Sequence, residues 1–133
     1  MANISTYLRN KLLDKAVGAV DFTPAVNLYF RAFSTVLTAA GAGTELDGDG
    51  YEALEVENNP TNFPAAASGA KSNAVRFDFA PATADWDDIL AIGVFDASSG
   101  GNLYYYQNLE DPLVILETEN IYFDIGDIDF SIS

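Results

Sequence analysis

The hydrophobic pattern of the chain has a helical period only near its N-terminus. In the stretch STYLRNKLLDKAVG, residues 5–18, the apolar side chains fall along one helical face, and they are Leu8, Leu12, Leu13, Ala16 and Val17. Ser5 or Thr6 suits the N-cap, and Gly18 suits the position just past the C-terminal end. Because a helix of about three turns is unstable alone in water, we expect it to pack on the rest of the chain or on another subunit.

After Pro24 the period becomes two, which is typical of strands with one buried face. In residues 25–33 the buried positions are expected to be Val26, Leu28, Phe30 and Ala32, alternating with Asn27, Tyr29, Arg31 and Phe33. Segments with strand composition follow at 51–58, 74–80, 89–95, 102–109, 113–119, 121–125 and 127–133. The nearly unbroken apolar run at 89–95 predicts a strand that is buried on both faces.

Two of these segments carry a further expectation, one about side-chain direction and one about where a strand begins. In residues 51–58, Tyr51, Ala53 and Val56 are expected on the buried face, opposite three glutamates. Pro112 is expected to open a separate strand over residues 113–119, because proline is tolerated at a strand's first position.

Turn signals separate the predicted strands. Residues 38–50 are rich in glycine, and Ser99-Gly100-Gly101-Asn102 predicts a hairpin turn. No helical pattern lies between strands, which argues against a parallel architecture. We therefore predict a single all-β domain over residues 1–133, an antiparallel β-sandwich or barrel of about eight short strands with one N-terminal amphipathic helix. Residues 1–23 form its N-terminal arm.

The composition removes most catalytic chemistry. Hydrophobic residues make up 49% of the 133 residues and aromatic residues 13%, which suits a folded core. The absence of Cys and His excludes disulfides, His-based zinc sites and Ser-His or Cys-His catalysis. A hydrolase with paired carboxylates is the remaining enzymatic alternative, but twenty acids form pairs by chance. We predict a protein that is not an enzyme, with no catalytic residue, no cofactor and no metal.

The charge is acidic and unevenly distributed. Twenty Asp and Glu against six Lys and Arg give a net charge of −14, which argues against nucleic acid or an anionic membrane as a partner. Residues 1–31 sum to +2, and residues 32–133 sum to −16. A basic arm on an acidic body suits docking, and a solvated helix face is the alternative. The candidate contacts on the arm are Leu8, Arg9, Lys11, Leu12 and Lys15.

Residues 44–50, TELDGDG, resemble the first half of a calcium-binding loop. Glu45, Asp47, Asp49 and Gly50 match the alternating start of such a loop, but its closing glutamate position falls on Val56. The flanking helices are also missing from the pattern. We interpret the segment as a turn with solvated carboxylates, and a weak cation site is the alternative.

A second acidic set lies near the C-terminus, where Asp124, Asp127 and Asp129 surround Gly126. Asp127 and Asp129 alternate with apolar residues, so we place them on the polar face of a strand. A metal site is the alternative here as well.

The run Tyr104-Tyr105-Tyr106 lies in a predicted strand, so its side chains alternate between the two faces. We expect at least one of these tyrosines to point outward, where it suits a protein contact or a sugar platform. Ordinary strand packing is the alternative for all three.

Six segments, in order along nearly the whole chain, resemble a family of small tailed-phage virion proteins. They are STYLRNKLLDKAVG, TPAVNLYFRAF, GTELDGDGYEALEVENN, NPTNFPAAASGAKSN, DWDDILAIGVFDASSGGNLYYYQNL and GDIDFSIS. The most specific parts are Gly50-Tyr51, Asn62-Phe63-Pro64 and residues 93–103. The family usually has small or neutral residues in place of Asp47 and Asp49, which argues against a family calcium site.

The resemblance implies a structural virion protein that binds and stabilises the phage capsid shell by protein–protein contacts, as a cement or decoration protein. Its expected partner is the major capsid protein lattice, and a homo-oligomer is expected. The expected place is the capsid exterior, after synthesis in the host cytoplasm. The alternative is a tail fibre or minor tail protein that contacts the host surface.

Overall fold

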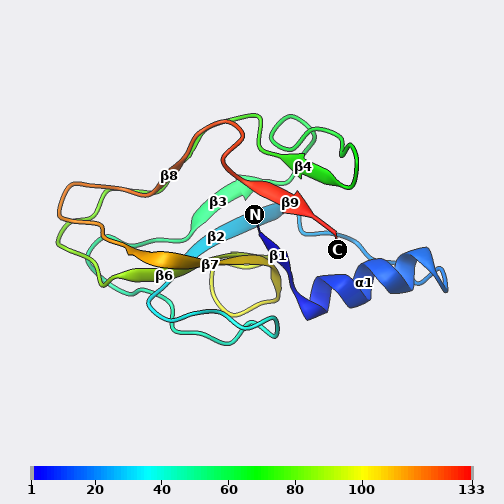
Figure 1. Cartoon of the computed structure of the whole chain (residues 1–133), viewed down its shortest axis with the longest axis horizontal. Helices are drawn as coiled ribbons and strands as arrows, with labels where there is room; N and C mark the ends of the chain where they lie inside the picture. Colours follow the sequence, from blue (N-terminus) through cyan, green and yellow to red (C-terminus); the bar gives the residue numbers. More distant parts are fainter. Residues whose placement is uncertain (1, 133) are drawn as a thin grey trace.

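The computed structural model describes residues 2–132, in which it has one helix, α1 (Thr6–Ala16), and nine strands (Figure 1). The strands are β1 (Asn3–Ile4), β2 (Asn27–Phe33), β3 (Leu54–Glu57), β4 (Ala70–Ser72), β5 (Phe77–Asp78), β6 (Ile89–Phe95), β7 (Leu103–Leu113), β8 (Tyr122–Phe123) and β9 (Asp129–Ser131). Five strands form an antiparallel sheet in the order β1-β7-β6-β2-β3, and two antiparallel ribbons pair β4 with β9 and β5 with β8. The predicted all-β fold with one N-terminal helix is confirmed.

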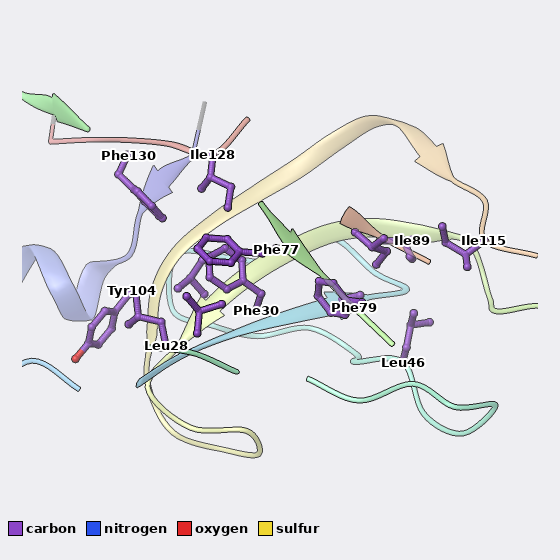
Figure 2. Packing of buried hydrophobic residues seen from close by; sticks show 14 of the residues in the cluster. Leu28, Phe30, Leu46, Phe77, Phe79, Ile89, Tyr104, Ile115, Ile128 and Phe130 are labelled. Carbon is purple, nitrogen blue, oxygen red and sulfur yellow. The ribbon is translucent and has the colours of Figure 1, made fainter. Parts of the chain in front are cut away.

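The main core lies between one face of the five-stranded sheet and the two ribbons. Phe30 of β2 has its ring centroid 6.3 Å from that of Phe77 on β5 and 5.7 Å from that of Phe123 on β8. At the other ribbon, Tyr105 of β7 meets Phe130 of β9 with centroids 4.9 Å apart. Figure 2 shows Phe30, Phe77 and Phe130 pointing from both layers into one cluster. The ribbons are therefore held to the sheet by aromatic packing, as in a sandwich.

Strand β2 follows the predicted alternation only in its first half. Leu28, Phe30 and Ala32 are buried as expected, but Phe33 is buried too, in a second cluster with Leu37, Ala91, Phe95 and Leu103. The loop after β2 covers the other face of the sheet, which the alternation of residues cannot reveal. Val26, expected to be buried, precedes the strand and is 77% exposed.

Strand β6 confirms the prediction of burial on both faces. It pairs with β2 on one side and β7 on the other, and most of its residues are buried. The predicted hairpin turn joins it to β7, where the Asp96 carboxylate accepts the Asn102 backbone N–H at 2.6 Å. Gly101 has φ +71°, and an added Cβ there would lie 2.5 Å from Asp96 Oδ1. The turn therefore requires glycine at that position.

Two predicted strands differ from the structure. β3 begins at Leu54, so Val56 is its buried residue, and Tyr51 and Ala53 precede it. Residues 113–119 are not a separate strand, because β7 continues through Pro112. The β6–β7 register shifts between Ile89 and Ala91, and such a bulge tolerates a proline that lacks an N–H.

Candidate functional site

Helix α1 begins firmly attached to the sheet. The Ser5 hydroxyl accepts the Leu8 N–H at 3.0 Å and donates to the Leu103 carbonyl, so the predicted N-cap at Ser5 is confirmed. Leu8 is buried, and the Tyr7 ring stacks on Tyr104 with centroids 6.1 Å apart. Strand β1, which the sequence pattern did not predict, pairs with β7 just before the helix. The first turn of α1 is thereby fixed to β7.

The rest of α1 extends away from the sheet (Figure 1). We call the exposed apolar side chains of the helix and of the residues just after it the arm ridge: Leu13 is 60% exposed, Val17 is 73% and Val20 is 55%. Gly18, with φ +114°, follows the helix end as predicted. Part of the predicted apolar stripe therefore packs on the body, and part stays mostly exposed. No helix in this range has the length and apolar character needed to cross a membrane.

Three basic side chains accompany the arm ridge. Arg9 and Lys15 are exposed, and Lys11 is half-buried with its ammonium 5.7 Å from the ring centroid of Tyr7. The ion pairs found within residues 2–132 all involve arginines of the β body. The cations of the arm therefore have no carboxylate partner in this part of the chain.

An apolar groove of about 290 Å³ runs beside α1. Leu12 is half-buried at its wall, so this predicted contact faces the groove. Among its other lining residues are Phe22 and Pro24 after the helix, Tyr104 and Tyr105 of β7, and Phe130 of β9. No Asp or Glu belongs to the lining, and Lys71 does. The groove therefore continues the apolar surface of the arm toward β7 and β9.

None of the three candidate tyrosines is exposed. Tyr104 is 7% exposed, and its hydroxyl accepts the Ala25 N–H at 3.1 Å. Tyr105 is half-buried and donates its hydroxyl to the Ser131 carbonyl at 3.2 Å, while Tyr106 packs against the second cluster. Burial raises the pKa of Tyr104 and Tyr105. The expectation of an outward tyrosine is not met, because both faces of the sheet are covered at β7.

The acidic turn at residues 44–50 does not gather its carboxylates. Glu45 turns inward, where Oε1 accepts from Arg31 Nη2 at 2.7 Å and Oε2 accepts from the Tyr51 hydroxyl at 2.6 Å. Asp47 and Asp49 are exposed, and Asp49 has φ +53°. Within residues 2–132, no three or more carboxylates form a group that could hold a metal ion. The predicted turn is present, but its first acid serves the core.

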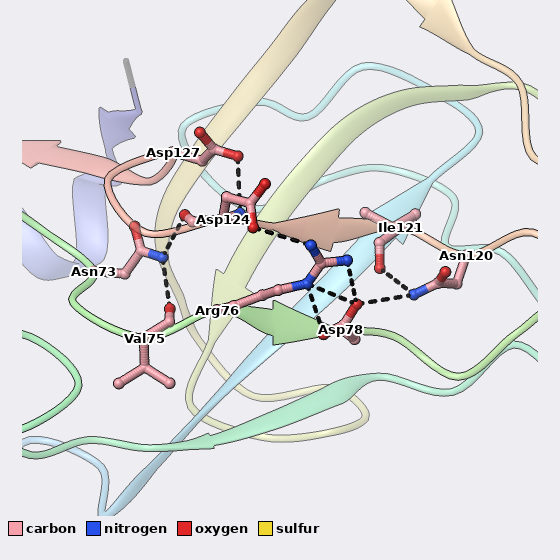
Figure 3. A network of polar contacts seen from close by, with 8 residues as sticks. All are labelled: Asn73, Val75, Arg76, Asp78, Asn120, Ile121, Asp124 and Asp127. Atoms are coloured by element: carbon pink, nitrogen blue, oxygen red, sulfur yellow. Dashed lines mark hydrogen bonds and ion pairs between the residues drawn. The ribbon is translucent and has the colours of Figure 1, made fainter.

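The second acidic set also serves the fold (Figure 3). Asp124 Oδ1 accepts from Arg76 Nη1 at 3.0 Å, and Asp127 Oδ2 accepts the Asp124 backbone N–H at 2.8 Å. Asp129 is exposed on β9, as expected for the polar face of a strand. These carboxylates form a turn and an ion pair.

Arg31 is the polar residue that sequence reasoning missed. Its side chain is 8% exposed, and its guanidinium lies 3.9 Å from the ring centroid of Phe95. The Tyr51 hydroxyl accepts the Ala32 N–H at 2.9 Å and donates to Glu45, and burial raises its pKa well above the usual range. Arg31 stands on the expected polar face of β2, so the pattern gave no signal of its burial. Because Arg31 is buried and paired with Glu45, the basic N-terminal region has one exposed cation fewer than its charge count indicates.

The comparison with known families covers the arm and the whole sheet. Residues 3–131, from the start of β1 to the end of β9, match the family described as Podophage GP4 fiber I protein gp80. Curated protein sequences give no match. The resemblance to tailed-phage virion proteins is confirmed. Because the match spans nearly the entire chain, the protein belongs to this gp80 fiber I family and is a phage fibre or structural protein.

Proposed function

We propose that this chain is a structural subunit of the phage fibre that attaches to a neighbouring virion subunit through its N-terminal arm. The arm ridge carries the proposal: its side chains are 55–73% exposed, beside cations that lack a carboxylate partner within residues 2–132. An exposed apolar patch rimmed by charge is typical of a protein contact. The family description supports the fibre as the place of that contact.

The attachment is adhesive. A stable interface buries roughly 800 Å² on each partner, more than a short helix offers alone. The groove beside α1, with its apolar lining, supplies further surface next to the ridge. The buried first turn holds the helix in place, so little conformational freedom is lost when the ridge is covered.

The proposed role is non-enzymatic. The chain has no His or Cys to act as a general base or nucleophile. Glu45, the inward carboxylate of the acidic turn, is occupied by Arg31 and Tyr51. Binding energy at the arm is therefore the proposed contribution to the virion.

Capsid decoration is the second candidate, and the charge distribution favours it. Residues 32–133 carry a net charge of −16, so a body facing outward from a shell would keep particles soluble and mutually repulsive. The basic arm would dock on the major capsid protein lattice. A protein that binds only the assembled shell stabilises it by mass action, so particles lacking it would lose heat stability.

Antibody labelling of intact virions separates the two candidates. Label on the fibre or tail is the expected result. Label confined to the capsid faces, together with reduced heat stability of particles that lack the chain, would favour decoration instead.

A variant of the arm ridge tests the attachment itself. Leu13→Ser/Val17→Ser changes two exposed side chains, so the fold should persist while the amount of protein in purified virions falls. Val36→Ser is the matched control, because Val36 is 56% exposed in the loop after β2. Normal incorporation of the arm variant would contradict docking through α1.

A further inference from the structure

A second unpartnered apolar surface lies at the end of β7 and just after it. We call residues 110–119 the distal segment. Its exposed apolar side chains are Leu113, Val114 and Leu116, with exposed fractions of 37%, 52% and 48%. They are less exposed than the side chains of the arm ridge, but each still has more than a third of its surface open to solvent.

The charge of the distal segment is opposite to that of the arm. Glu110, Asp111, Glu117 and Glu119 are all exposed. Asp85 lies against them, since its carboxylate accepts the Glu117 N–H at 2.8 Å. No Lys or Arg occurs anywhere from residue 77 to residue 133. The surface therefore combines exposed apolar side chains with four exposed acidic residues.

The distal segment is held in one conformation by the body. Ile115 is buried, and its carbonyl accepts the Trp86 N–H at 3.0 Å. The Thr118 N–H donates to the Ala82 carbonyl at 2.9 Å, and the Glu119 carboxylate accepts the Leu116 N–H at 2.8 Å. A surface fixed in this way loses little entropy on binding.

The two surfaces lie at opposite ends of the molecule. Figure 1, drawn with the longest axis horizontal, has α1 at the right-hand end and the turn after β7 at the left-hand end. A chain cannot bring its own arm ridge to its own distal segment in this arrangement. The complementary partner available to each surface is the same surface set on a second copy.

We propose that the chain associates head to tail, with the arm ridge and basic residues of one copy docked on the acidic distal segment of the next. Arg9 and Lys15 face the carboxylates of the partner copy, and the two apolar surfaces cover each other. The groove beside α1 is a less suitable docking site for a basic arm, because its lining includes Lys71 and no Asp or Glu. This inference rests on the proposed function, because it names the partner of the arm.

Head-to-tail docking has a consequence for assembly. The contact joins two different surfaces, so each added copy covers one of its own surfaces and leaves the other free for the next copy. Such an interface builds a ring when its rotation closes and an open filament when it does not. The association should strengthen with concentration.

Charge reversal on each side tests the pairing. Arg9→Glu/Lys15→Glu reverses the arm, and Glu110→Lys/Glu117→Lys reverses the distal segment. None of these four side chains takes part in an ion pair among residues 2–132. In sedimentation velocity at ~0.15 M salt, where screening acts beyond about 8 Å, the unaltered chain should show mass rising with concentration. Each double variant alone should associate at least about tenfold more weakly.

Mixing the two variants is the decisive test. In an equimolar mixture each reversed arm meets a reversed distal segment, and each native arm meets a native one, so association should return. Glu55→Lys/Glu57→Lys on β3 is the matched control for the distal reversal, because it makes the same change in net charge on a different strand. Equal weakening by this control, or failure of the mixture to associate, would overturn the pairing.

The failure of this inference is distinguishable from failure of the proposed function. A chain that stays monomeric at all concentrations, yet labels the fibre and loses incorporation in Leu13→Ser/Val17→Ser, would overturn self-association and keep the docking arm. A chain that polymerises through the two ends but labels only capsid faces would keep self-association and overturn the fibre as its place in the virion.

Discussion

Arg31 and Arg76 make nearly the same contacts in two different regions. Arg31 pairs with Glu45 at 2.7 Å and lies 3.9 Å from the ring centroid of Phe95. Arg76 pairs with Asp78 at 3.1 Å and lies 4.1 Å from the ring centroid of Tyr122. The side chains of the first pair are 8% and 23% exposed, and those of the second 48% and 47%.

The comparison shows that burial, rather than contact geometry, decides what an ion pair does for the fold. Loss of one partner from a buried pair leaves a charge without solvation, whereas an exposed charge is solvated by water. Arg31 also donates to the Gly100 carbonyl at 2.8 Å, so its guanidinium joins the loop after β2 to the β6–β7 hairpin. Arg76 joins two surface turns (Figure 3).

Removal of the buried guanidinium should have the largest effect. Arg31→Met leaves Glu45 without its cation and the Gly100 carbonyl without its donor, so we expect the free energy of unfolding to fall by about 3 kcal/mol. Urea unfolding followed by tryptophan fluorescence measures the change. A fall no larger than that of the same substitution at Arg76 would break the comparison.

Removal of the Tyr51 hydroxyl should have a smaller effect on the same network. Tyr51→Phe leaves the Ala32 N–H without its acceptor and Glu45 without one donor, while the Arg31 ion pair stays. We expect a loss of about 1–2 kcal/mol in the same urea measurement. Tyr122→Phe is the matched control, since Tyr122 is 50% exposed and should be nearly neutral.

The buried network should also give stability an alkaline limit. The pKa of Tyr51 is raised in the folded state, by burial first and then by its hydrogen bond to Glu45. As pH rises above about 10, tyrosine ionises in the unfolded chain before Tyr51 ionises in the folded one, so the free energy of unfolding falls. Below that pH the contribution is fully present.

Tyr51→Phe should flatten this alkaline slope without abolishing it, because burial raises the pKa of Tyr104 and Tyr105 in the same direction. Urea midpoints measured from neutral to alkaline pH test the prediction. An identical slope in the variant and the unaltered chain would contradict the role assigned to Tyr51.

The exposed network should respond least. Arg76→Met makes the same chemical change as Arg31→Met, but we expect no resolvable shift of the urea midpoint at neutral pH. The Arg76 hydrogen bond lowers the pKa of Asp78, so any stability it supplies is present above the usual Asp pKa and lost as pH falls. A large neutral-pH loss would mean that this surface pair is less exposed to water than its side chains indicate.

Much of the framework could be predicted from residue patterns. The helix, its Ser5 cap, the doubly buried β6 and the hairpin turn were predicted because each depends on neighbours in sequence. β1 was missed because two residues carry no period. Pro112 was placed at a strand start because the bulge that accommodates it involves β6, which lies earlier in the chain.

The candidate site divides in the same way. The sequence identified Arg9 and Lys15 on the arm, but not which part of the apolar stripe the body would cover. At least one of the tyrosines at 104–106 was expected to point outward, and the loop after β2 and the β9 ribbon cover them. Residues 113–119 of the distal segment were predicted as a strand, so its exposed apolar side chains were not recognised as a surface.

The sequence by itself determined an antiparallel β fold with a capped amphipathic helix and a basic arm on an acidic body, because these follow from periods, turn residues and charge counts along the chain. Only the tertiary structure decided that Arg31 and Glu45 belong to the core, and that Leu13, Val17 and the apolar residues after β7 stay uncovered at opposite ends. Burial depends on which distant segments fold over a residue, and no local pattern records that.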